Sequence, residues 1–233
     1  MTAIFKREFK AYFSTPVGYI ILALYFLFLG LNFRAMYSYG IPEVENVISG
    51  VSVLVVFGIP ILTMRLISED RRQKTDQILF TSPVGIKGIV LGKFLAALSV
   101  FVICFIPSVI YEIIVAAYVE VNVLLYVYSL FGMLFLGAAF IAMGMFISSL
   151  TESPVVAAIV TFIANILTLY MTSLASFVNN SVISSLLEKL AFIEVYQNFT
   201  SAVFSVGDVL YLLSITAIFL VLSVCSLESR RYA

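Results

Sequence analysis

Long apolar runs alternate with short polar segments along almost the whole chain. Each run reaches the range of about 17–25 residues with which a helix crosses the hydrocarbon core of a bilayer. The runs cover residues 17–33, 47–66, 88–117, 123–150, 155–174 and 209–226. This pattern predicts an all-α, polytopic integral membrane protein with six transmembrane helices. Pro107 lies inside the third run and predicts a kink there, because an interior proline removes a backbone hydrogen bond.

The polar segments between the runs differ in character. In residues 1–16 an aromatic side and a basic side alternate at helical spacing, which predicts an interfacial helix lying on a membrane surface. The aromatic side holds Phe5, Phe9, Tyr12 and Phe13, and the basic side holds Lys6, Arg7 and Lys10. Residues 175–208 are too polar for a span and too apolar for a solvated loop. We expect short helices at the outer leaflet in that segment.

The most highly charged segment joins the second and third runs. Residues 69–83 hold six of the 26 charged residues of the chain. An unpaired charge in lipid costs roughly 2.5–3.5 kcal/mol even on lenient insertion scales. The segment, taken here as residues 68–87, must therefore lie in water, either as a solvated connector or as a helix that another protein contacts.

Composition agrees with a membrane protein and excludes several function classes. Of 233 residues, 62% are hydrophobic and only 11% are charged, against about 25% charged in soluble domains. The net charge is zero, so bulk attraction to nucleic acid is not expected. The chain has no histidine, which removes the commonest metal ligand and the usual catalytic base. Cys104 and Cys225 both fall in apolar runs and are expected to be free thiols.

Lysine and arginine residues predict the orientation of the six spans. With both termini inside, eleven of the 13 basic residues lie on inner segments, and only Arg34 and Lys189 lie on outer ones. The positive-inside rule therefore predicts cytosolic termini and a cytosolic 68–87 segment. We expect one transmembrane domain, residues 1–233, with no separate soluble domain.

Few residues of the sequence are candidates for catalysis or ligand binding. The only Gly-Lys pair, Gly92-Lys93, lacks the earlier glycine and the following Ser or Thr of a phosphate-binding loop, so no ATPase site and no catalytic residue is expected. Glu112 is the one candidate carboxylate within a run. It either reaches the outer interface because Pro107 shortens the span, or makes a polar contact in a substrate path.

Small and polar residues gather on one side of the fifth run, within an arc of roughly 100° at helical spacing. They are Ala157, Thr161, Ala164, Asn165, Thr168 and Thr172. Two readings remain open for this face. It can pack tightly against other helices, as small residues favour in membranes, or it can line a pathway or a dimer seam. A smaller stripe in the fourth run, Gly137, Gly144 and Ser148, is interpreted as packing.

Three stretches resemble permeases of type-2 ATP-binding-cassette (ABC-2) exporters, most of all the gliding-motility-associated (Gld-type) group. They are the charged segment with Ser82-Pro83 and the following 90–96 stretch, the opening 6–19, and the close 207–231. The likeness covers nearly the whole chain in order. The chain departs from the family pattern at Lys74 and Gln77, where the family has Gly and Glu, and it lacks a histidine that the family often has before the last span.

The resemblance implies a bacterial plasma-membrane exporter permease without its own ATPase activity. Partner ABC ATPase subunits would hold ATP and magnesium, and a second permease chain, identical or related, would pair with this one. The coupling residues that the resemblance implies are Glu69, Asp70, Arg71, Arg72, Thr75, Gln77, Ile78 and Leu79, on a helix around residues 69–79. The alternative is a non-transporting scaffold that passes ATPase-driven motion to an extracytoplasmic accessory protein.

Overall fold

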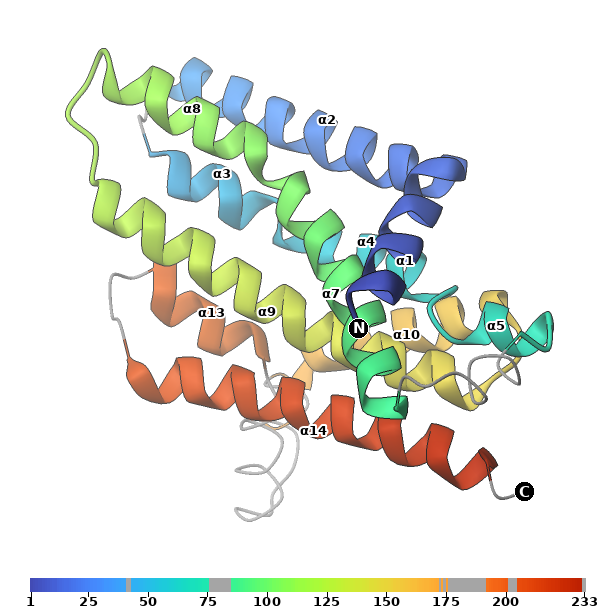
Figure 1. Ribbon diagram of the computed structural model, residues 1–233. Helices are drawn as coiled ribbons and strands as arrows, with labels where there is room; N and C mark the ends of the chain where they lie inside the picture. The colour runs from blue at the N-terminus through green and yellow to red at the C-terminus, as the bar shows by residue number, and fades with distance from the viewer. Residues whose placement is uncertain are drawn as a thin grey trace.

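The computed structural model describes residues 1–40, 43–75, 85–171, 173, 175, 192–200 and 205–231. Across these ranges the regular elements are all α-helices, as expected, and no strand occurs. α9 crosses the middle of the helix bundle (Figure 1). The helices are α1 (Thr2–Ser14), α2 (Pro16–Tyr39), α3 (Val44–Gly50), α4 (Ser52–Thr63), α5 (Ser68–Arg72), α7 (Ile86–Cys104), α8 (Ile106–Ala116), α9 (Val123–Leu150), α10 (Pro154–Leu169), α13 (Phe192–Thr200) and α14 (Val206–Arg231).

Five segments of the described chain are long and apolar enough to cross a membrane. They are Pro16–Tyr39, Ser52–Arg72, Ile86–Ala116, Val123–Leu150 and Val206–Ser229. The fifth predicted run contains α10, which has 16 residues and is therefore about 24 Å long. That is short of the ~30 Å hydrocarbon core, so a sixth span is not confirmed.

The helix formed by the first apolar run is longer than that run, residues 17–33. α2 continues through Arg34 to Tyr39, since arginine is a good helix former. Gly40 then stops the helix with a left-handed backbone, φ +67°, which glycine adopts without steric cost. Its N–H reaches the carbonyls of Met36 and Tyr37, so the cap glycine decides the boundary rather than the charge.

The second and third apolar runs are interrupted helices. The second run divides at Val51 into α3 and α4, and residues 64–67 form a turn before α5. The third divides at Phe105 into α7 and α8, which confirms the break expected near Pro107. The segment Ile86–Ala116, which comprises α7, Phe105 and α8, has 31 residues. A helix of that length measures about 46 Å, more than the ~30 Å of the hydrocarbon core.

Small residues let the neighbouring helices approach α9 closely. A Cβ at Gly137 would overlap the Phe101 ring of α7, and one at Gly144 would overlap Thr63 of α4. Both positions are therefore packing sites, as predicted. α13, which lies within the 175–208 segment, packs its Phe199 ring against Gly132 of α9. Its depth in a membrane stays a prediction, and the rest of that segment lies largely outside the described residues.

Two ends of the bundle can be distinguished in Figure 1. The α5 end carries α5, the turn between α9 and α10, and the C-terminus of α14. The α3 end carries the start of α3, the turn between α8 and α9, and the start of α14. α1, the predicted interfacial helix, lies against α7 and α2 on the side of the α5 end.

Candidate functional site

The turn between α4 and α5 is held by a side chain from the middle of the bundle. The Ser148 hydroxyl of α9 accepts hydrogen bonds from the backbone N–H groups of Ile67 (3.2 Å) and Ser68 (3.1 Å), and donates one to the Met64 carbonyl (3.2 Å). The first N–H groups of a helix have no partner within the helix, so Ser148 caps α5 from outside. We call residues 64–67 with Ser148 the α5 joint. Ser148 was predicted only to pack, so its role here was missed.

α5 is shorter than the helix expected around residues 69–79. It ends at Arg72, and Lys74 follows with φ +55°. The chain then turns back, because Thr75 donates from its backbone to the Asp70 carbonyl (2.9 Å) and from its hydroxyl to the Asp70 carboxylate (3.1 Å). Gln77, Ile78 and Leu79 lie outside the described residues, so the predicted coupling residues within the described chain are those of the Glu69–Thr75 stretch.

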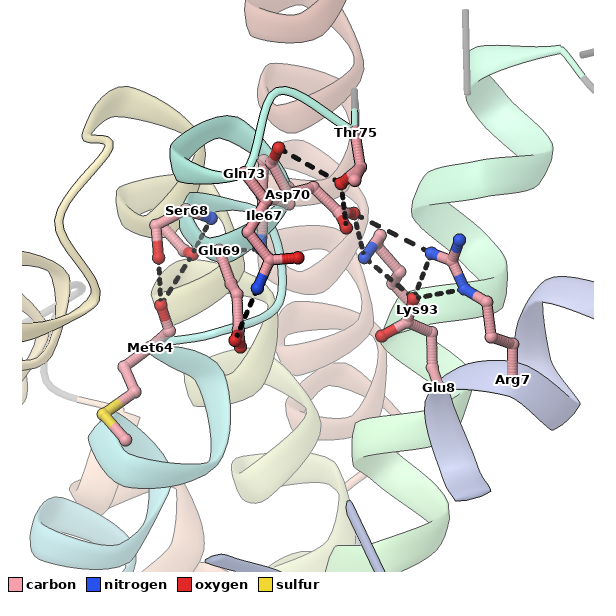
Figure 2. Close-up of polar contacts among 11 residues, drawn as sticks. Arg7, Glu8, Met64, Ile67, Ser68, Glu69, Asp70, Gln73, Thr75 and Lys93 are labelled. Atoms are coloured by element: carbon pink, nitrogen blue, oxygen red, sulfur yellow. Dashed lines mark hydrogen bonds and ion pairs between the residues drawn. The ribbon is translucent and has the colours of Figure 1, made fainter. Parts of the chain in front are cut away.

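Four charged side chains from α1, α5 and α7 meet beside the joint (Figure 2). Lys93 Nζ lies 3.0 Å from Glu8 Oε1 and 2.7 Å from Asp70 Oδ2. Arg7 contacts Glu8 as well, and lies 3.8 Å from Asp70. We call Arg7, Glu8, Asp70 and Lys93 the ion cluster. It links the predicted interfacial helix, the predicted coupling segment and a transmembrane helix.

The ion cluster is balanced in charge, and its lysine and two carboxylates are largely shielded from water. Only 3% of the Lys93 side chain is exposed, against 14% for Glu8, 19% for Asp70 and 50% for Arg7. A buried ammonium is tolerated because two carboxylates surround it. Burial by itself lowers the pKa of Arg7, but the hydrogen bond to Glu8 and the charges of Glu8 and Asp70 raise it overall.

A buried tyrosine adds a further tie between α1 and α4. The Tyr12 hydroxyl donates to the Leu62 carbonyl in the last turn of α4 (2.7 Å). Burial raises the pKa of this hydroxyl and the Glu8 charge adds to the rise, so Tyr12 stays protonated and remains a donor. Ile4, Glu8 and Tyr12 therefore form the inward stripe of α1, at a spacing of four residues.

The two arginines of α5 have different surroundings. Arg71 bonds to the Ser149 carbonyl (3.1 Å) and to Glu152 Oε1 (2.8 Å), and only 7% of its side chain is exposed. Within the chain it therefore contacts the end of α9 and the turn before α10, and its expected contact with a partner protein stays a prediction. Arg72 is exposed. Glu69 contacts Arg65 and Gln73 on the surface of the same segment.

A cavity of about 330 Å³ lies between α1, α4 and α5. Tyr12, Thr15, Arg65 and Gln73 line it together with the ion cluster. The arrangement suits mechanical coupling between helices. Among the described residues no group of three or more His, Cys, Asp or Glu side chains could hold a metal ion.

The small, polar face predicted on the fifth run is buried against other helices of the same chain. Ala157, Thr161, Asn165 and Thr168 are buried, Ala164 is half-buried, and Thr172 lies outside the described residues. α10 packs against α4 and α9, and Thr161 lies next to Gly144. The structure therefore brings most of this face together as a helix-packing surface. Whether it also lines a pathway stays a prediction.

Asn165 has a specific partner on α4. Pro60 lies inside α4 and has no N–H, so it leaves the carbonyl of Val56, four residues earlier, without its helical donor. Asn165 Nδ2 donates to that carbonyl at 3.3 Å. The polar residue of α10 thus satisfies the backbone group that the proline of α4 frees.

Several residues of this region could have been noticed in the sequence. Lys93 is a charge near the start of an apolar run, and such a residue needs a partner when it is buried. Glu8 is the only acid among the basic residues of α1. Nothing local pairs these two residues, which are 85 positions apart. Arg71 and Glu152 are likewise 81 positions apart, so their pairing appears only in the folded chain.

Comparison with known proteins identifies the family. No curated protein matches the chain. The family model described as ABC-2 family transporter protein matches residues 2–231, which is nearly the whole chain and includes α1, the α5 joint and α14. The apolar helices of the fold agree with a multi-pass membrane protein. The chain is therefore an integral membrane permease of the ABC-2 transporter family.

Proposed function

We propose that this chain is the permease subunit of an ABC exporter and that ATPase subunits act on it through the Ser68–Thr75 segment. Permeases of the ABC-2 family work with ABC ATPase subunits and dimerise. ATP and magnesium belong to those subunits. Four finer assignments in this proposal rest on the sequence alone. They are the Gld-type group, a bacterial plasma membrane, cytosolic termini and six spans.

The observation that carries the proposal is the way in which the segment is attached. The ion cluster ties Asp70 to α1 and α7, and the α5 joint ties Ser68 to α9 through Ser148. Arg71 adds contacts to the last turn of α9 and to Glu152 in the turn before α10. A force applied to α5 would therefore reach three helices, α1, α7 and α9, through short polar contacts, whereas a solvated connector would transmit little.

The exposed charges of the segment supply the contact to the ATPase. Arg72 and Lys74 are exposed, while Arg71 is held within the permease. Charge-assisted hydrogen bonds to a partner contribute roughly 1.5–3 kcal/mol each when desolvated. Arg72 therefore replaces Arg71 as the principal arginine expected at the ATPase surface.

The test is co-purification of the native ATPase with an Arg72→Glu/Lys74→Glu permease. We expect the variant to insert and dimerise normally and to lose most of the bound ATPase and of ATP-dependent transport. Lys10→Glu, an exposed charge change on α1, is the control and should retain both. Full ATPase binding and transport in the double variant would show that the segment is only a connector.

The scaffold remains the second candidate function, and one observation favours it. The polar face of α10 packs against α4 and α9 and is not turned toward a cavity of the described chain. A scaffold would need no path for cargo. Stimulation of ATPase activity by an extracytoplasmic partner, without stimulation by any cargo, would favour this function over export.

A further inference from the structure

A buried carboxylate at the α3 end has no role in the coupling described above. Glu112 of α8 is 6% exposed, although carboxylates are almost never buried without a partner. Its Oε1 atom has no hydrogen-bond partner among the described residues. The nearby charge that acts on it is another carboxylate, Glu45 of α3, which packs against α8.

Two hydroxyl pairs lie one helical turn deeper than these carboxylates. Ser49 follows Glu45 by one turn of α3, and its hydroxyl lies 3.3 Å from that of Tyr196 on α13. Ser108 precedes Glu112 by one turn of α8, and its hydroxyl lies 3.2 Å from that of Tyr126 on α9. α3 runs into the bundle and α8 runs out of it (Figure 1), so both hydroxyl pairs lie on the inner side. The side chains of these two carboxylates and four hydroxyl residues offer only oxygen atoms.

The charge of this site is not balanced within the described chain. The ion pairs of the described residues lie on α1, α5 and α7, in the turn before α5 and in the turn after α9, and none includes Glu45 or Glu112. Burying an uncompensated charge is costly, and two neighbouring carboxylates repel each other as well. A positively charged ligand would remove both penalties.

We propose that Glu45 and Glu112 bind a divalent cation of the Mg²⁺ or Ca²⁺ type at the α3 end. Oxygen donors without nitrogen or sulfur select hard cations, and two carboxylates neutralise a double positive charge. Since only two carboxylates meet here, water completes the coordination shell, as is usual for Mg²⁺. The ion would join α3 to α8 and so hold the connection from the first span to the second against the third. This site is independent of the ATPase contact.

The test is thermal unfolding of the purified permease in detergent, titrated with MgCl₂ or CaCl₂. A ligand at a hundredfold excess over its Kd should raise Tm by about 5–10 °C for a chain of this size. Glu112→Gln and Glu45→Gln should each abolish the rise. Glu120→Gln removes an exposed carboxylate at the same end and should keep it. Choline should not replace the divalent ion.

A direct measurement covers the case in which a variant fails to fold. Mn²⁺ binding to the wild-type permease, followed by electron paramagnetic resonance, should saturate and be reversed by excess Mg²⁺. A wild-type Tm that does not change with any divalent ion, together with no saturable Mn²⁺ signal, would overturn the proposal. A proton shared by the two carboxylates would then be the explanation for their burial. An equal Tm rise in Glu112→Gln would place the ion elsewhere and overturn it as well.

Discussion

Replacement of Lys93 by methionine is the sharpest test of the ion cluster. Methionine keeps most of the length and volume of the side chain but removes the ammonium that lies 3.0 Å from Glu8 and 2.7 Å from Asp70. The two carboxylates would then lie close together, with Arg7 as their remaining cation. Breaking a buried ion pair by removing one partner costs about 3–5 kcal/mol. Because Glu8 and Asp70 keep 14% and 19% exposure, we expect the lower end of that range.

The expected loss in the free energy of unfolding corresponds to a measurable fall in Tm. A loss of about 3 kcal/mol corresponds to a fall in Tm of about 6–12 °C for a chain of this size. Tm is measured by heating the permease in detergent and following, by size-exclusion chromatography, the fraction that stays monodisperse. Lys87→Met is the matched control, because Lys87 lies on the same helix but is exposed, and it should shift Tm little.

A second variant separates charge balance from simple packing. Neutralising the three more buried members in Glu8→Gln/Asp70→Asn/Lys93→Met should recover most of the lost Tm, since replacing all partners of a buried ion pair together is often nearly neutral. Arg7, the fourth member, is half exposed and keeps its charge in contact with water. If the cluster transmits motion, the recovered protein should still couple ATP hydrolysis to transport poorly. A Lys93→Met permease as stable as the wild type, or a triple variant with no recovery, would refute the reasoning.

Three further outcomes follow from the contacts. Ser148→Ala should leave the α5 joint without its cap and lower stability by about 1 kcal/mol, measured by Tm, with a larger relative loss of coupled transport; unchanged stability and transport would contradict the joint's role. Asn165→Leu should cost about 1 kcal/mol in the wild type and less in a Pro60→Ala background, where the backbone N–H returns, and a double-mutant cycle with no coupling would rule out that hydrogen bond. A cysteine at Glu43 should react with an impermeant thiol reagent on intact cells and one at Gln73 should not, and the reverse labelling would invert the predicted orientation.

The helical class could be predicted because it depends on local patterns. Runs of apolar residues predicted most of the spans, and Pro107 predicted the break between α7 and α8. The grouping of Thr161 and Asn165 on one face followed from helical spacing alone. These features need only the order of residues within one or two turns.

The contacts that organise the candidate site could not be predicted in that way. Lys93 was counted only as a basic residue on the inner side, and Arg71 was assigned to a partner protein. Each finds its partner about 80 positions away, and helical spacing carries no information on such pairs. The length of α5 was misjudged for a different, local reason. The turn at Lys74 is stabilised by bonds from Thr75 back to Asp70, which compete with helix continuation.

The burial of Lys93 also determines how the permease responds to ionic strength. At ordinary salt, dissolved ions largely screen exposed charges that are more than about 8–10 Å apart, and buried pairs are screened much less. The Lys93 side chain is only 3% exposed, so salt screens its contacts weakly. Strong salt should therefore weaken surface contacts made by Arg72 and leave the ion cluster intact. A salt wash would then yield a permease stripped of peripheral subunits whose internal helix contacts are unchanged, ready for reassembly when the salt is removed.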